Sequence, residues 1–188
     1  SKIARIMQQA TAGAGGAGLD ITEVFDTQLY TGTGSDLTIN NGIDLSTEGG
    51  MVWFKHITED RTHAIVDTER GIANGYLDSA TAANQTDNSQ TPKTYNTNGF
   101  TIGSGSEQNR QNDKFVAWTF RKAKKFFDVI TYTGNGTAGR TVSHNLGCAV
   151  GAVWVKRYNT TNNWACWHRG IANNDYLQLN TDTQAYTD

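Results

Sequence analysis

The amino-acid sequence predicts an all-β protein: tandem antiparallel β-sandwich repeats, lectin-like or jelly-roll-like, preceded by a short N-terminal helix. Three observations support this fold class. Gly (20 residues), Thr and Asn are abundant and Pro occurs once, which is typical of strands joined by polar turns. Short runs of alternating apolar and polar residues recur between turn signals, roughly every eight to twelve residues. A long part of the chain is also repeated about a hundred residues later.

The internal repeat consists of four matched blocks that keep their order. The pairs are residues 24–35 and 126–137, 50–55 and 151–156, 70–74 and 169–173, and 76–77 and 176–177. Their offset drifts by only about three residues, which chance does not explain. The period is longer than that of solenoid repeats. Each copy is therefore predicted to be a domain, with residues 19–122 as the first and residues 123–188 as the second.

The first 18 residues differ from the rest and are predicted to be an anchor peptide on a tether. Ile3, Ile6, Met7 and Ala10 share one face at helical spacing, and residues 13–18 form a flexible Gly-rich run. A helix of about ten residues is not stable alone in water, because nucleation is costly. We therefore expect this peptide to dock into another protein or to bundle with copies of itself. The alternative interpretation is a frayed terminus.

The first repeat contains the strand signals of a sandwich. Strands are predicted at residues 25–30, 37–39, 51–56, 62–67, 100–103 and 114–121. Asn41-Gly42 supplies the positive φ that tight hairpin turns need. The polar stretches 78–94 and 104–112 are predicted to be irregular surface loops.

The second repeat reproduces residues 24–87 and has no counterpart of residues 88–122. It therefore lacks a strand equivalent to residues 115–120, and a sandwich without this strand exposes an edge and half of its core. Two explanations stay open. The favoured one is that the chain is the N-terminal part of a longer protein that completes the repeat. The other is that a neighbouring chain supplies the strand.

Charge and composition exclude several classes of protein. The net charge of −2 provides no basic surface for nucleic acid. No apolar run approaches the roughly 20 residues that span a bilayer, so membrane insertion is not expected. Two cysteines do not make a disulfide framework, which indicates assembly in a reducing cytosol.

No enzyme activity, cofactor or metal site is predicted. Cys166 and His168 would share one side of a strand, but no further ligand lies at a spacing that suits zinc. The sequence contains neither Gly-x-Ser-x-Gly nor His-Glu-x-x-His. Glu59 and Asp60 have no counterpart in the second repeat, so they are interpreted as a solvated rim rather than a glycosidase pair.

Two aromatic residues of the second repeat are candidates for ligand binding. Trp164 and Trp167 lie on a segment that has no aromatic counterpart in the first repeat, and they could stack on sugar rings. The preferred interpretation is that both are core or interface tryptophans.

Several short motifs together resemble one known family. They are IARIMQQA followed by a Gly-Ala run at residues 3–18, NGIDL at 41–45, EGGMVWFK at 48–55, GFTIG at 99–103, VAWTFRK at 116–122 and FFDVITYTGNG at 126–136. In this combination the chain resembles repeat-containing tail fibre or tail appendage structural proteins of tailed bacteriophages, especially marine ones. The resemblance covers essentially the whole chain.

This resemblance implies a virion structural protein that is assembled in the host bacterial cytoplasm and located in the phage tail. Ile3, Ile6 and Met7 would belong to the peptide that attaches the protein to a tail adaptor, nozzle or other tail protein, and the assembly would be a homotrimer. The resemblance supplies no catalytic residues. Two alternatives stay open: a carbohydrate-binding module that recognises host surface glycan, and a capsid decoration or head-fibre protein.

Overall fold

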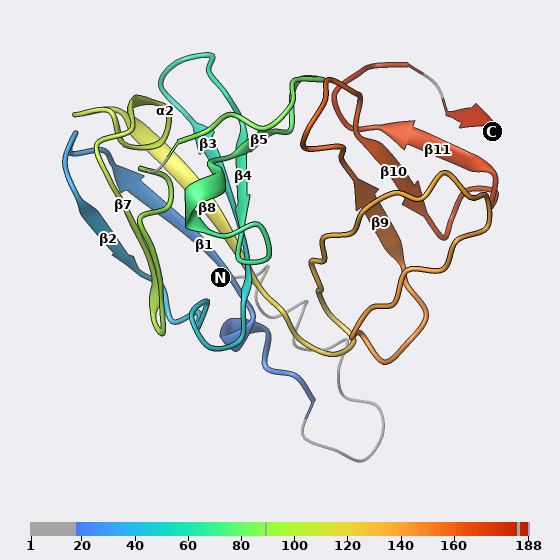
Figure 1. Ribbon diagram of the computed structural model, residues 1–188. Helices are drawn as coiled ribbons and strands as arrows, with labels where there is room; N and C mark the ends of the chain where they lie inside the picture. The colour runs from blue at the N-terminus through green and yellow to red at the C-terminus, as the bar shows by residue number, and fades with distance from the viewer. Residues whose placement is uncertain (1–17, 89, 184, 188) are drawn as a thin grey trace.

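The computed structural model describes residues 18–88, 90–183 and 185–187 and shows an all-β protein (Figure 1). The predicted docking residues Ile3, Ile6, Met7 and Ala10 lie outside this range. Helical structure in the described residues is limited to three short turns: η1 (Ile21–Glu23), η2 (Ile72–Asn74) and α2 (Ser106–Asn109). No helix among these residues is long and apolar enough to cross a membrane.

The strands form three antiparallel sheets. A five-stranded sheet has the order β1 (Phe25–Thr31), β8 (Lys114–Arg121), β3 (Gly50–His56), β4 (Ala64–Asp67), β5 (Leu77–Asp78). A three-stranded sheet has the order β2 (Leu37–Asn40), β7 (Gly99–Ile102), β6 (Thr94–Asn96). A four-stranded sheet has the order β12 (Tyr186–Thr187), β11 (Asp175–Gln178), β10 (Ala165–His168), β9 (Ala152–Val155).

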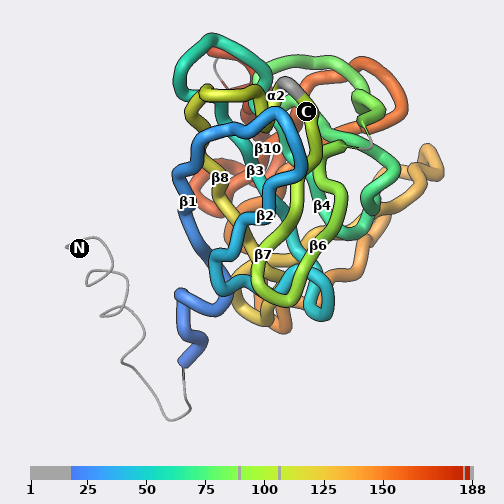
Figure 2. Tube along the Cα trace, turned by 90° about the vertical axis from the view of Figure 1, so that its left-hand side faces the viewer, coloured from blue at the N-terminus to red at the C-terminus, as the bar shows by residue number. Residues whose placement is uncertain are grey.

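The three-stranded and five-stranded sheets face each other and enclose the first hydrophobic core, and together they are called the sandwich below. Figure 2 shows β2, β7 and β6 in front of the five-stranded sheet. Phe54 of β3 and Phe100 of β7 are fully buried and meet edge to face, with ring centroids 5.4 Å apart. Alternate residues of each strand enter this core, as the period of two in a strand requires.

The four-stranded sheet packs on the other face of the five-stranded sheet, which is therefore a middle layer (Figure 1). Met51, Ile65 and Leu77 of the middle layer form a second core with Trp164 and Cys166. Burial on both faces explains why β4 is buried at every position, whereas a strand with one solvated face would alternate.

Polar contacts fix this second interface. The indole Nε1–H of Trp164 donates to the backbone oxygen of Asp78 at 2.8 Å. Lys156 Nζ donates to the backbone oxygen of Ala82 at 3.1 Å, and the backbone N–H of Gln85 donates to the oxygen of Tyr158 at 2.8 Å.

The structure shows one difference between the repeated segments and corrects one sequence-based prediction. Residues 128–133 repeat the sequence of β1 but form no strand. β1 pairs only with β8, and among the described residues no strand pairs with residues 128–133 as β8 pairs with β1. The stretch 104–112, predicted to be a surface loop, contains α2 and the fully buried Asn109. Asn109 is buried because its side chain accepts from the backbone N–H of Thr33 at 2.8 Å and donates to the backbone oxygen of Gly103 at 2.7 Å.

The Trp164 contact gives a stability prediction. We expect Trp164→Ala to lower the free energy of unfolding by about 3–5 kcal/mol, because it removes a buried ring and leaves a cavity between two sheets. Trp164→Phe is the matched control. It keeps an aromatic ring and removes the hydrogen bond to Asp78, so it should cost about 1 kcal/mol for that bond plus a smaller packing term. Denaturant unfolding followed by circular dichroism measures both. A Trp164→Ala variant within about 0.5 kcal/mol of the parent, as for a surface site, would contradict the packing described.

Candidate functional site: the open edge and open face of the four-stranded sheet

The hairpin β9–β10–β11 pairs in the same register as the hairpin β3–β4–β5. In the sandwich Trp53 lies opposite Ile65, and Ile65 lies opposite Leu77. In the four-stranded sheet Trp154 lies opposite Cys166, and Cys166 lies opposite Leu177. The matched sequence blocks place Trp154 at the position of Trp53, so residues at equivalent positions have equivalent partners.

The two hairpins differ at the edge beyond their first strand. β3 lies between β4 and β8, whereas β9 ends the order of its sheet among the described residues. The Arg169 N–H donates to the Gly151 oxygen at 2.9 Å, which sets the alternation of hydrogen bonds along β9. Val153 and Val155 therefore bond toward β10, and the backbone groups of Ala152 and Trp154 point to the other side. We call this side of β9 the open edge.

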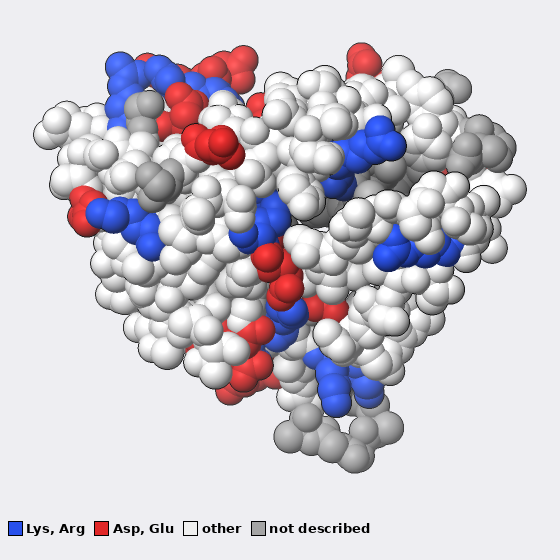
Figure 3. Space-filling model, in the orientation of Figure 1, with Lys and Arg blue, Asp and Glu red and all other residues white. Residues whose placement is uncertain are grey.

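The side of the four-stranded sheet that faces away from the sandwich is also uncovered by the residues that the structure describes. This open face consists of Val153, Val155, Ala165, Trp167 and Tyr176. The equivalent residues of the sandwich, all buried in its core, are Val52, Phe54, Ala64, Val66 and Tyr76. Val153 and Val155 are each 37% exposed, whereas Val52 and Phe54 are 0% exposed. On the side of the molecule that Figure 3 shows, the part formed by the C-terminal residues is mostly uncharged, with separate basic patches.

The open face contains a shallow hollow of about 360 Å³. Trp167 and Tyr176 line it together with Asn173, Asn174 and Asp175. The ring of Tyr176 also stacks on Tyr186, with centroids 5.4 Å apart and an interplanar angle of 19°. Aromatic faces beside amide and carboxylate groups can bind sugar rings or pack against a further protein segment.

The structure separates the two tryptophans that the sequence suggests for glycan stacking. Trp164 is 4% exposed and lies in the second core, so its ring is not available to a sugar. For Trp164 the structure therefore agrees with the preferred interpretation, a core tryptophan, and not with the glycan-stacking alternative. Trp167 lies on the open face and is half-buried. Because successive residues of a strand point to opposite faces, Cys166 faces the sandwich and Trp167 faces away from it.

Equivalent residues of the two hairpins meet at the interface between the sheets. Trp53 contacts Trp154 edge to face at a centroid distance of 5.7 Å, and Trp118 also contacts Trp53, at 5.6 Å. The two hairpins therefore pack through equivalent faces. Burial also raises the pKa of the Cys166 thiol in this interface, which disfavours the reactive thiolate. Cys148 and Cys166 are both free.

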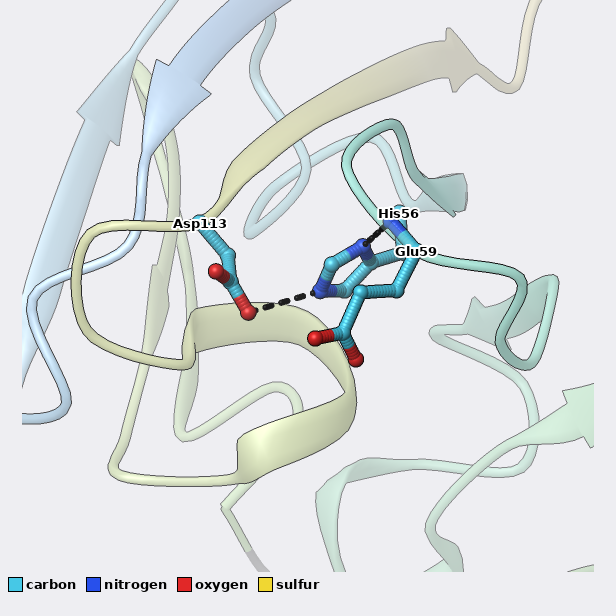
Figure 4. A group of neighbouring side chains, drawn as sticks. All are labelled: His56, Glu59 and Asp113. Atoms are coloured by element: carbon cyan, nitrogen blue, oxygen red, sulfur yellow. Dashed lines mark hydrogen bonds and ion pairs between the residues drawn. The ribbon is translucent and has the colours of Figure 1, made fainter.

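A second group of polar side chains lies at one end of the sandwich. His56 ends β3, Glu59 follows it, and Asp113 precedes β8 (Figure 4). The Glu59 backbone N–H donates to His56 Nδ1 at 3.0 Å. Nδ1 is therefore an acceptor, and the proton of the neutral ring lies on Nε2, which donates to Asp113 Oδ2 at 3.0 Å.

Two arginines neutralise the carboxylates of this group. Arg61 Nε donates to Glu59 at 2.7 Å, Arg110 Nη1 donates to Glu59 at 3.0 Å, and Arg110 Nε lies 3.6 Å from Asp113. The hydrogen bond from Arg61 and the charge of Arg110 hold the pKa of Glu59 below its usual value. The group ties the loop after β3 to the loop before β8.

The same three residues offer one ligand atom each within 4.8 Å of one another, and they form the single such group found among the described residues. Their arrangement does not suit a metal ion. Both ring nitrogens of His56 are used in hydrogen bonds, and the carboxylates have guanidinium partners. No sequence motif singles out His56. Its pairing with Asp113, 57 residues away, leaves no local sequence signal.

The polar group gives a metal-binding prediction. We expect excess zinc to leave the melting temperature unchanged, because binding would have to break the Glu59–His56 hydrogen bond and displace two arginines. His56→Ala should lower the free energy of unfolding by about 1–3 kcal/mol, because the Glu59 N–H and the Asp113 carboxylate both lose their hydrogen bond to the ring. Differential scanning calorimetry with zinc and with a chelator measures both. A zinc-dependent rise in melting temperature that His56→Ala abolishes would identify a metal site instead.

Neither a curated protein nor a solved structure gives a significant match. Residues 20–188 match the family described as "Domain of unknown function (DUF7483)". The match covers the sandwich and the four-stranded sheet together, and the chain therefore belongs to this family.

Proposed function

We propose that this protein is a virion structural protein, the N-terminal part of a tail fibre or tail appendage of a tailed bacteriophage. The observation that carries the proposal is the packing of two hairpins with identical register through equivalent faces, Trp53 against Trp154. Such packing joins successive β-units rigidly. The sequence resemblance to tail fibre and appendage proteins supplies the virion context.

In this proposal the chain carries tandem sandwich repeats, and the four-stranded sheet belongs to a second repeat that is not complete within the chain. The shared register and the matched blocks support this relation. The open edge and open face are then the places where the remaining strands of the second repeat belong. The chain serves as a spacer and not as an enzyme.

Attachment is assigned to the first 18 residues. Ile3, Ile6, Met7 and Ala10 would dock into a tail adaptor, nozzle or other tail protein, and the Gly-rich run would give the sandwich freedom to project. The assembly is proposed to be a homotrimer in the virion, produced in the host bacterial cytoplasm. A head-fibre or capsid decoration protein is the alternative location for the same domains.

A second candidate function is recognition of host surface glycan. The hollow lined by Trp167 and Tyr176 favours it, because aromatic rings beside amides and a carboxylate are typical of sugar-binding sites. The equivalent residues of the sandwich, Val66 and Tyr76, are core residues, which favours a packing role instead. Glycan-array binding that Trp167→Ala abolishes would favour the glycan function.

Cryo-electron microscopy of the phage particle tests the proposed function. We expect density for the sandwich on the tail, and we expect particles assembled with a chain that lacks residues 1–17 to lose it. The purified shortened chain is the control, and its melting temperature should equal that of the full chain because residues 20–188 form the family domain. Density on the capsid would favour the head-fibre alternative. A particle without this protein would overturn the proposal.

A further inference from the structure

We propose that the open edge and open face of the four-stranded sheet bind an extended polypeptide segment with the strand pattern of residues 88–122. The segment adds a strand antiparallel to β9 in the register that β8 takes on β3. This inference rests on the repeat relation within the proposed function. It does not depend on the location of the protein in a virion.

The sandwich shows what occupies the equivalent edge. The Lys122 N–H donates to the Gly49 oxygen at 2.9 Å, so the hydrogen bonds between β3 and β8 join Met51 with Phe120 and Trp53 with Trp118. In β9 the equivalent residues are Ala152 and Trp154, whose backbone groups form the open edge. The edge therefore presents the same alternation of donors and acceptors that β8 satisfies elsewhere in the chain.

The side chains at the edge also match a strand like β8. In the sandwich Trp118 lies opposite Trp53 and packs against its ring. Trp154 already contacts Trp53 but is 44% exposed. An incoming strand in the β8 register places an aromatic residue opposite Trp154, which extends the row of tryptophans and buries the exposed ring.

Residues 128–133 are a second segment that lacks the strand pairing of its sequence counterpart. They repeat the sequence of β1, and the partner of β1 is β8 alone. In the structure these residues form no strand. A strand inserted next to β9 supplies the partner that residues 128–133 lack, as β8 does between β3 and β1.

The open face indicates that the segment is longer than a single strand. The equivalent face of the sandwich is covered by the sheet that contains β6 and β7, which lie within residues 88–122. This argues against β9 pairing with β9 of a second copy, because that contact would cover the edge and leave Val153, Val155 and Trp167 exposed. If the segment covers the open face, the hollow beside Trp167 becomes part of a hydrophobic core.

The test uses the full chain and a synthetic peptide with the sequence of residues 88–122. Isothermal titration calorimetry should show binding at one peptide per chain. Ala152→Pro should weaken binding at least about tenfold, because it removes an open-edge N–H and blocks the approach of a strand. Proline is tolerated where the N–H of an edge strand faces solvent, so the parent fold should persist. Ala152→Val is the matched control, because it keeps the N–H and should bind like the parent.

A modified peptide keeps the test decisive if the Ala152→Pro chain does not fold. N-methylation of the peptide at the position of Trp118 removes the donor that faces β3 in the sandwich, and it should weaken binding to the parent chain to a similar extent. Three results would overturn the proposal. They are no peptide binding, binding that neither change weakens, and self-association of the chain that Ala152→Pro abolishes without any peptide binding. None of these concerns where the protein lies in the particle, which microscopy decides separately.

Discussion

Hydrogen bonding of β8 along both of its edges is the interaction on which the rest of the structure depends. β8 pairs with β1 on one side and with β3 on the other, over the full length of both strands. Within residues 18–88, 90–183 and 185–187, β1 has no other neighbour, and β3 would have an open edge without β8. The C-terminal part of the chain shows how the strands behave where no counterpart of β8 is present among the described residues. Residues 128–133 form no strand, and β9 is open on the side where its equivalent meets β8. Local sequence alone does not make these strands, because an isolated strand gains too little from its own residues.

Burial of the middle sheet on both faces is the second constraint. One face is covered by the three-stranded sheet and the other by the four-stranded sheet, so two cores share a single layer. Trp164 closes the second core, and its hydrogen bond to Asp78 satisfies the indole N–H in a buried place. In the proposed function, a joint of this kind would hold successive β-units in a fixed relation, as a spacer in a fibre requires.

Much of the sandwich could be predicted from the sequence, because β1, β3 and β8 carry the aromatic and β-branched residues typical of strands and lie between turn signals. The register of the second hairpin follows from the repeated blocks, since equivalent residues kept equivalent partners. Packing between distant segments could not be predicted. Trp164 meets Asp78 across 86 residues, and His56 meets Asp113 across 57, with no periodic signal to link them. Residues 128–133 repeat the sequence of β1 and yet form no strand, because a strand there depends on a partner and not on the residues' own pattern.

Hydrogen exchange along β9 in the isolated chain tests the central claim most directly. The claim is that β9 is the counterpart of β3 with the β8 side left open. The amides of Ala152 and Trp154 should then exchange much faster than those of Val153 and Val155, which bond to β10. In β3 the amides that face β4 and the amides that face β8 should both be protected. Equal protection along β9 would contradict the account, since it would mean that the edge is already paired.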